Sequence, residues 1–246
     1  MQQKTSRMCD AGKRIGLKIN TLKTKVMKMN DANNHKIKID NEEIEEVDKF
    51  TYLGAIVSNE GGSTEDLKNR IGKARSTFAR LRNIWKSKKI RRGTKIRLYK
   101  TLVLPVLLYG SETWKMNKSN DNAVNVFHHD CLRCIMNINW QDRIRTTELL
   151  TRSKTKPMSV EIKRRRWKFI GHILRQDRFN DSNIALTWRP EGRRRGRPKT
   201  TWRRTVEVER EEAGWSDWGA VRRAAADRVK WRRSVEALCA TPARSG

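Results

Sequence analysis

Apolar residues between positions 63 and 86 recur at steps of three and four, the spacing of one face of an α-helix. Ser63 as a helix cap and Asp66 in the first turn mark its predicted start. The apolar face consists of Leu67, Ile71, Ala74, Phe78, Leu81 and Trp85. Lys68, Lys73 and Arg75 lie off that face, so we predict a helix that packs on one side and offers cations on another. A solvated basic face without a ligand is the alternative.

Further segments share this helical spacing. One opens at Gly93, and Pro105 is expected to kink or end it before a buried run that reaches Tyr109 and Gly110. A helix is predicted over residues 121–138, because Val124, Phe127, Cys131, Leu132, Ile135 and Ile138 share one face. A shorter helix is expected around residues 167–174, and residues 200–238 have a helical composition with a break at Gly214.

The first sixty residues instead show the pattern of strands and turns. Residues 23–29 form one candidate strand, and residues 35–44 resemble a hairpin that reverses at Asp40 and Asn41. Residues 51–57 are expected to form a third strand, before Gly61 and Gly62. We therefore predict an α+β chain that is predominantly α-helical, with a small antiparallel portion ahead of the helical units.

The charge of the chain indicates its partner. Its 56 Lys and Arg oppose 27 Asp and Glu, which leaves a net charge of +29 on 246 residues. Neutralising phosphates releases condensed counterions, so we predict non-specific binding to RNA or DNA that weakens as salt rises. The longest apolar run, residues 102–109, is far shorter than the roughly 20 residues of a membrane span. With no secretory signal at the N-terminus, we expect an intracellular protein outside membranes.

The densest basic run lies at residues 192–199, where two glycines and a proline disfavour a regular helix. We expect an extended loop ordered by a polyanion, with Arg193, Arg195, Arg197 and Lys199 as its phosphate contacts. Residues 195–198 also have the Arg-Gly-Arg-Pro core of an AT-hook, which enters the narrow minor groove of A·T-rich DNA. Non-specific phosphate binding is the leading interpretation, with which a nuclear-localisation patch is compatible, and minor-groove readout is the alternative.

A second basic run, Arg164, Arg165 and Arg166, is also predicted to contact phosphates. Arginine interleaves with several tryptophans that are candidates for stacking on unpaired bases: Trp167, Trp202, Trp215, Trp218 and Trp231. Packing in small helical cores is the favoured interpretation for Trp167 and Trp231, whereas Trp202 stays open. Asp227 with Arg228 is expected to form a local salt bridge.

The sequence also permits a zinc site. His128, Cys131 and Cys134 are candidate ligands, with His129 or His172 as a fourth. Both cysteines fall within the apolar pattern of a predicted helix, where they pack as small hydrophobic residues, so we favour packing over metal binding. The four cysteines are expected to be reduced.

Several short motifs occur in an order that resembles non-LTR (LINE-type) retrotransposon reverse transcriptases. Gly-Leu-Lys-Ile-Asn at residues 16–20 and Phe-Thr-Tyr-Leu-Gly at residues 50–54 resemble the last palm motifs of that family. Later stretches are similar to those that follow the thumb in LINE-type reading frames: residues 106–114, 167–172, 196–198 and 227–232. The resemblance covers roughly residues 16–238, and the ordered set is more specific than any one motif.

This resemblance implies a role without polymerase chemistry. The family holds two Mg²⁺ ions with palm aspartates, including a Tyr-x-Asp-Asp motif, and the present sequence has no Asp-Asp pair. We expect no polymerase activity and no cofactor here, with Mg²⁺ and the polymerase and endonuclease domains belonging to upstream parts of a parent element. Lys23 matches the family lysine thought to protonate pyrophosphate, and Tyr52 and Gly54 match the primer grip. Ordinary strand and turn positions are the alternative for all three.

The resemblance also implies a division of the chain. We predict a palm remnant with a primer-grip-like hairpin at residues 1–58, a helical thumb-like region at 59–115, a helical post-thumb region at 116–190, a basic loop at 191–200 and C-terminal helices at 201–246. The predicted function is binding of template and primer nucleic acid as the carboxy-terminal part of a reverse transcriptase. A free-standing DNA-binding or chromatin protein derived from such an element is the alternative, and a zinc module is a third.

Overall fold

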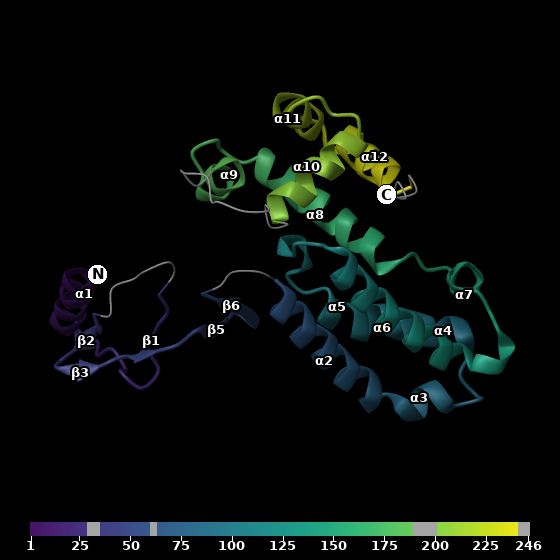
Figure 1. Ribbon diagram of the computed structural model, residues 1–246, viewed down its shortest axis with the longest axis horizontal. Helices are drawn as coiled ribbons and strands as arrows, with labels where there is room; N and C mark the ends of the chain where they lie inside the picture. Colours follow the sequence, from purple (N-terminus) through teal and green to yellow (C-terminus); the bar gives the residue numbers. More distant parts are fainter. Residues whose placement is uncertain (29–34, 60–62, 189–200, 241–246) are drawn as a thin grey trace. The chain divides into compact units, whose positions relative to one another are not determined.

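The computed structural model describes residues 1–28, 35–59, 63–188 and 201–240 of the chain. The chain divides into two compact units, Met1–Asp66 (unit 1) and Leu67–Gly246 (unit 2) (Figure 1). The fold is α+β and predominantly helical, which confirms the predicted class. Among the described residues, no helix has both the length and the apolar composition that a bilayer-spanning segment needs.

Unit 1 combines a helix with short strand pairs. Its described elements are α1 (Gln2–Arg14), β1 (Lys25–Val26), β2 (Lys38–Ile39), β3 (Glu42–Glu43), β4 (Glu45–Glu46), β5 (Lys49–Tyr52) and β6 (Ala55–Ser58). Cys9, Ile39 and Ile44 form its small buried core. The prediction of strands and turns alone is wrong for α1, which has no side-chain cap at its start. Gln2 instead joins α1 to β2 through two hydrogen bonds with the backbone of Lys38, at 2.8 and 2.9 Å.

The strands of unit 1 pair in three small sheets, of which two are antiparallel hairpins and one, β1 with β4, is parallel. Asp40 and Asn41, with φ of 48° and 68°, join β2 to β3 and confirm the predicted reversal. The single strand expected over residues 51–57 is wrong, because the chain reverses at Leu53 and Gly54, whose φ angles are 49° and 81°. Two successive positive φ angles make the tight turn that hairpins favour, and leucine at the first position gave no sequence signal for it.

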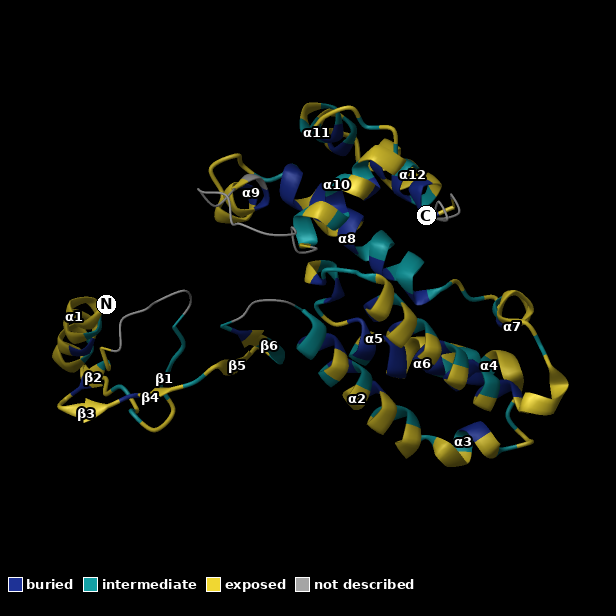
Figure 2. Cartoon of the chain, viewed as in Figure 1, coloured by how far each residue is buried: buried dark blue, intermediate teal, exposed yellow. Residues whose placement is uncertain are grey.

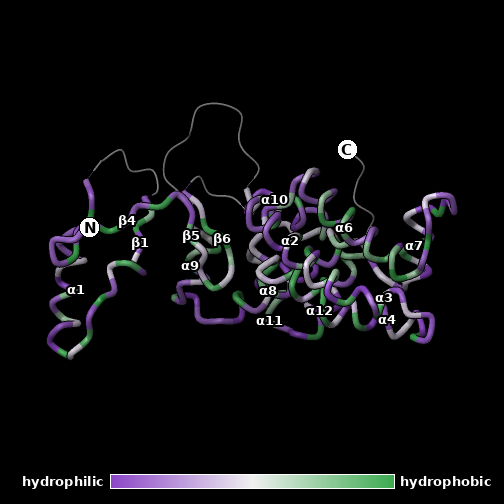
Figure 3. Tube along the Cα trace, turned by 90° about the horizontal axis from the view of Figure 1, so that it is seen from below, coloured by the Kyte–Doolittle hydropathy of each residue, from purple (hydrophilic) through white to green (hydrophobic). Residues whose placement is uncertain are grey.

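Unit 2 begins with helices around one hydrophobic core. They are α2 (Thr64–Arg80), whose first turn belongs to unit 1, α3 (Arg82–Lys86), α4 (Arg92–Leu98), the π-helical turn η1 (Tyr99–Val103), α5 (Leu104–Leu107), η2 (Ser111–Thr113), α6 (Lys118–Met136), η3 (Trp140–Asp142) and α7 (Thr146–Ser153). Figure 2 shows buried positions along α5 and α6, and Figure 3 shows hydrophobic and hydrophilic positions alternating along these helices. The apolar face predicted for α6 is buried from Val124 to Ile135, which confirms that helix.

Pro105 does not end its helix. The wider π-helical turn η1 precedes it, and α5 continues to Leu107, where the absent N–H of proline falls in the first turn of α5. The buried run predicted to reach Tyr109 is wrong at that residue, which is 51% exposed. The left-handed conformation of Gly110 (φ 70°) follows the end of the helix, and the ring of Tyr109 packs under the guanidinium of Arg70 with 4.3 Å between them.

The second half of unit 2 has a core built on tryptophan. Its described helices are α8 (Met158–Leu174), α9 (Asp181–Thr187), α10 (Trp202–Glu212), α11 (Trp218–Ala226) and α12 (Arg228–Leu238). Trp167 and Trp231 are 0% and 3% exposed, and the ring of Trp215 stacks on that of Trp231 at 5.2 Å. The packing role of Trp167 and Trp231 and the break at Gly214 (φ 75°) are confirmed. The basic loop predicted at residues 191–200 lies outside the described residues.

Candidate nucleic-acid interface

The net charge of the chain belongs to one unit. Unit 1 contains 11 Lys and Arg against 11 Asp and Glu, whereas unit 2 contains 45 against 16. Unit 2 therefore carries the whole net charge of +29. A polyanion is attracted by unit 2, and unit 1 adds no net attraction.

Within unit 2, residues 67–111 contain 14 Lys and Arg and no Asp or Glu. We call them the basic helical segment, which runs from α2 through α5. Because it has no carboxylate of its own, none of its cations is neutralised by a neighbour in the segment. Its exposed cations are therefore available to phosphate, whereas Arg70 and Lys95 are buried, at 6% and 7% exposed.

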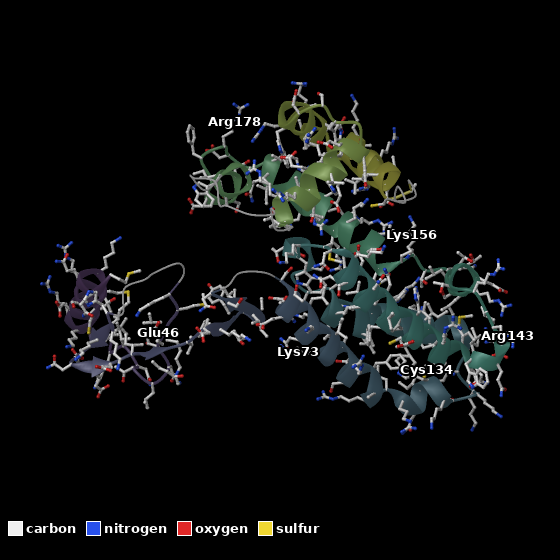
Figure 4. The ribbon with its side chains drawn as sticks, in the orientation of Figure 1. Glu46, Lys73, Cys134, Arg143, Lys156 and Arg178 are labelled. Carbon is white, nitrogen blue, oxygen red and sulfur yellow. The ribbon has the colours of Figure 1, made fainter. Side chains whose placement is uncertain are left out.

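Helix α2 separates its apolar residues from most of its basic ones, as predicted, but Arg70 is buried. Leu67 and Ala74 are 1% and 0% exposed and belong to the first core of unit 2. Lys68, Lys73 and Arg75 are exposed, and within the part of the chain that the structure describes they form no ion pair (Lys73 is labelled in Figure 4). These three predicted site residues therefore have both the exposure and the charge that phosphate binding requires.

The connection between α3 and α4 adds cations that the sequence-based prediction did not single out. Around it lie five exposed side chains: Lys86, Lys88, Lys89, Arg91 and Arg92. The signal that would have found them is the absence of acidic residues across the whole segment, which periodicity alone does not reveal.

The basic run in α8 contains one residue that faces inward. Arg166 is 0% exposed, pairs with Glu209 of α10 and donates to the backbone oxygen of Trp114 at 2.9 Å. The indole N–H of Trp167 donates to the other carboxylate oxygen of Glu209 at 2.8 Å. The predicted contact of Arg166 with nucleic acid is incompatible with this burial, because its charge is already compensated inside the protein.

Arg164 and Arg165, unlike Arg166, are partly exposed to solvent. Arg164 pairs with Glu161 and with Glu236 of α12, and its Nε lies 2.9 Å from Oε1 of Glu236. The side chain of Arg165 is 38% exposed, donates to the backbone oxygen of Leu108 at 3.3 Å and lies 3.6 Å from Glu161. Both arginines remain candidates for an anion that approaches the start of α8.

The candidate zinc ligands have other roles in the structure. No three His, Cys, Asp or Glu side chains gather at metal-binding distance within the described residues. His128 is buried with its Nδ1 2.8 Å from the hydroxyl of Tyr99. Cys131 is buried as predicted, but the packing prediction is wrong for Cys134, which lies on the exposed side of α6. Burial lowers the pKa of His128 to about 3 and raises the pKa of Cys131 to about 12. Both side chains are therefore neutral at pH 7.

The candidates in unit 1 lie in turns. Lys23 is exposed, and its backbone N–H donates to Oδ1 of Asn20 at 3.0 Å in the turn before β1. Tyr52 is 62% exposed at the end of β5, beside Gly54 in the hairpin turn. No hydrogen bond or ion pair between described residues joins Lys23 to this hairpin. The primer-grip interpretation of Tyr52 and Gly54 stays a prediction.

The remaining candidates are two half-buried tryptophans that pack against the second core, one helix cap, and residues that are not described. The indole of Trp202 donates to the backbone oxygen of Glu112 at 2.8 Å, and that of Trp218 donates to Glu207 at 2.9 Å. Asp227 forms no salt bridge among the described residues and instead caps α12, accepting from two backbone N–H groups at 2.8 and 3.1 Å. The predicted loop contacts lie outside the described residues: Arg193, Arg195, Arg197 and Lys199.

Comparison with known proteins finds similarity over two stretches of the chain. The model of a family described as a domain of unknown function (DUF6451) matches residues 77–109, inside the basic helical segment. A transposon-derived, uncharacterized protein of Caenorhabditis elegans is 27% identical over 201 residues, which cover 76% of this chain and 71% of the relative. No solved structure matches the chain.

Proposed function

We propose that this chain binds nucleic acid through unit 2, with the basic helical segment as its main contact, as the carboxy-terminal part of a retrotransposon reverse transcriptase. The observation that carries the proposal is the segment itself, with 14 Lys and Arg and no Asp or Glu. On α2, Lys68, Lys73 and Arg75 are exposed while the apolar face is buried, so the helix is both anchored in the core and available to phosphate. Template and primer strands are the expected partners.

The place within a reverse transcriptase is supported by two further observations. The ordered motifs at residues 16–20, 50–54 and 106–114 resemble LINE-type enzymes, and the similar nematode protein is transposon-derived. The chain itself has no Asp-Asp pair for the two Mg²⁺ ions of polymerisation. Its contribution is therefore to hold nucleic acid, with the metal-dependent chemistry supplied by other parts of the parent element.

The proposal is tested with a triple variant of α2, Lys68→Glu with Lys73→Glu and Arg75→Glu. Fluorescence anisotropy measures the binding of labelled single-stranded RNA, single-stranded DNA, duplex and hybrid oligonucleotides over a series of salt concentrations. We expect affinity to fall at least about tenfold and the slope of log K against log salt to decrease by about 2 to 3, one phosphate contact for each lost cation.

The matched control is a triple variant in unit 1, Lys4→Glu with Arg7→Glu and Lys18→Glu. These residues are exposed, and the substitutions change the net charge by the same amount. We expect this control to retain most of the affinity and the salt slope. Equal losses in both triple variants would mean that binding follows total charge alone and would remove α2 as the contact. An original chain that binds no oligonucleotide in dilute salt would remove the proposed function.

A second candidate is a free-standing DNA-binding protein derived from a transposon. The nematode relative favours it, since the 201 aligned residues make up 71% of that protein, whose length is thus comparable with that of this chain. This candidate would use the AT-hook-like residues Arg195 and Arg197. A preference for A·T-rich duplex that is lost in the Arg195→Ala and Arg197→Ala double variant supports it, whereas absence of such a preference removes minor-groove readout.

A further inference from the structure

Unit 2 contains a pocket with an excess of positive charge. It has a volume of about 360 Å³ and lies between η1 and α5, α6, and the start of α8. Five of its lining residues are cationic and one, Glu161, is acidic; the cations are Lys100, Lys154, Lys156, Arg164 and Arg165. A larger pocket of about 440 Å³ has no such excess, because Asp121, Glu209 and Glu212 line it along with its cations.

Backbone carbonyl groups hold two of these cations in place. The Nζ of Lys100 donates to the carbonyl oxygen of Lys154 at 3.0 Å, and Arg165 donates to that of Leu108 at 3.3 Å. A carbonyl oxygen fixes the position of a cation without neutralising its charge; Arg165 also lies 3.6 Å from Glu161, whereas Lys100 forms no ion pair among the described residues. Lys154 and Lys156 are exposed, and among the described residues Lys156 forms an ion pair only with Glu236, 3.9 Å away (Lys156 is labelled in Figure 4). The pocket is therefore preorganised for an anion.

His128 supplies a neutral donor to the lining of the pocket. It lines the pocket although it is 0% exposed, and its Nδ1 lies 2.8 Å from the hydroxyl of Tyr99. Burial lowers the pKa of His128 to about 3, so the ring carries one proton at pH 7. When Tyr99 donates to Nδ1, that proton is on Nε2, an atom that has no hydrogen-bond partner among the described residues. An anion in the pocket can accept the hydrogen bond that this buried Nε2 lacks.

The amino end of α8 also favours an anion in this pocket. This 17-residue helix begins at Met158, which lines the pocket, and its cap residue Pro157 has no side-chain cap. The backbone N–H of Met158 donates to Oδ1 of Asn125 at 2.8 Å. The partial positive charge of a helix amino end favours a bound anion.

We propose that this pocket receives the terminal phosphate of a polynucleotide, an inference that rests on the proposed nucleic-acid binding. A terminal phosphate carries a charge of about −1.5 to −2 at pH 7, more than the single charge of a phosphodiester, and so matches the larger cation excess. The volume lies near the lower end of small-molecule sites, about 300–1,000 Å³, which admits one nucleotide and excludes paired strands. A chain end can enter such a space, whereas a continuous strand passes over its opening.

The experiment compares two otherwise identical single-stranded oligonucleotides, one with a 5′-phosphate and one with a 5′-hydroxyl, and a matched pair at the 3′ end. Binding to the full chain is measured by anisotropy at fixed salt. A hydroxyl-ended strand one nucleotide longer controls for the added charge. We expect one phosphorylated end to bind about tenfold more tightly than its hydroxyl counterpart. Adenosine 5′-monophosphate in excess should abolish that preference and leave the binding of the hydroxyl strand unchanged.

Two variants test whether the preference for a phosphorylated end arises in the pocket. Lys154→Gln with Lys156→Gln removes two exposed pocket cations without touching a core, and should reduce the preference to about twofold or less. The α2 variant with Lys68→Glu, Lys73→Glu and Arg75→Glu should weaken both strands and retain their ratio. If both strands bind equally well to the original chain, or the preference survives the pocket variant, the pocket assignment is overturned and the proposed function stands. If neither strand binds, both the pocket assignment and the proposed function are overturned.

Discussion

Gly171 of α8 is where that helix approaches the indole of Trp231 most closely. A Cβ atom at Gly171 would lie 2.0 Å from Nε1 and 2.5 Å from Cε2 of Trp231, far inside van der Waals contact. The indole cannot retreat easily, because its N–H donates to the backbone oxygen of Trp167 at 3.1 Å and its ring stacks on Trp215. Space rather than backbone conformation therefore requires glycine at this position.

We expect Gly171→Ala to destabilise unit 2 by about 2 kcal/mol or more, the upper part of the range for overpacked cores. Gly72→Ala is the matched control, since Gly72 lies within α2 and a Cβ there would meet nothing within 4 Å. The free energy of unfolding of that control should be higher by about 0.5–1 kcal/mol, because alanine is favoured over glycine inside a helix by this amount. Urea unfolding followed by tryptophan fluorescence measures both, and equal midpoints for the two variants would contradict the packing argument.

Arg166 shows which residue-scale properties the sequence can predict. The run of three arginines predicts a cationic surface, and Arg164 and Arg165 retain part of it. Nothing local distinguishes Arg166 from its neighbours, because its burial depends on Glu209, 43 positions further along the chain. Exposed cations on α2 were predictable because helical periodicity alone separates Lys68 from the buried face. Local periodicity does not predict a pairing between residues that are far apart in the sequence.

Elements with strong local signals were predicted well, and elements that depend on tertiary contacts were not. Helix α6 combines a capping residue, Asn117, with an apolar face, and its predicted start at residue 121 lies within one turn of the observed Lys118. Helix α1 lacks a capping side chain and is joined to β2 by Gln2, so its residues gave no comparable signal. The β5–β6 turn was missed because leucine rarely adopts the positive φ that Leu53 has.

The start of α6 provides a test at the scale of one element. The side chain of Asn117 accepts a hydrogen bond from the backbone N–H of Asn120 at 2.8 Å. The apolar face of this helix packs into the first core of unit 2. We expect Asn117→Ala to cost about 1 kcal/mol, the usual value of a lost amino-terminal cap. Asn122 is an exposed position inside the same helix, so Asn122→Ala should leave the free energy of unfolding unchanged or raise it by a few tenths of a kcal/mol. Thermal unfolding by circular dichroism compares them, and a loss in Asn122→Ala as large as in Asn117→Ala would show that the cap is not the cause.

At the scale of the whole molecule, charge divides the chain more sharply than secondary structure does. Unit 2 has 45 Lys and Arg against 16 Asp and Glu, so its cations repel one another, whereas unit 1 is balanced at 11 each. The same excess that attracts a polyanion therefore destabilises unit 2 in isolation. Salt should affect the two properties in opposite directions, because screening relieves internal repulsion and weakens phosphate contacts.

All nine tryptophans lie beyond residue 66, so tryptophan fluorescence reports the unfolding of unit 2 alone. We expect the Tm of unit 2 to rise by a few degrees between about 50 and 500 mM sodium chloride, while oligonucleotide binding falls steeply over the same range. Chloride is preferred to sulfate, which stabilises folded proteins generally and resembles phosphate. The variant with Lys68→Glu, Lys73→Glu and Arg75→Glu lowers the net charge by 6, from +29 to +23, and should show a smaller rise. A Tm that falls with salt would mean that the ion pairs of unit 2, such as Arg164 with Glu236, outweigh its excess of like charge.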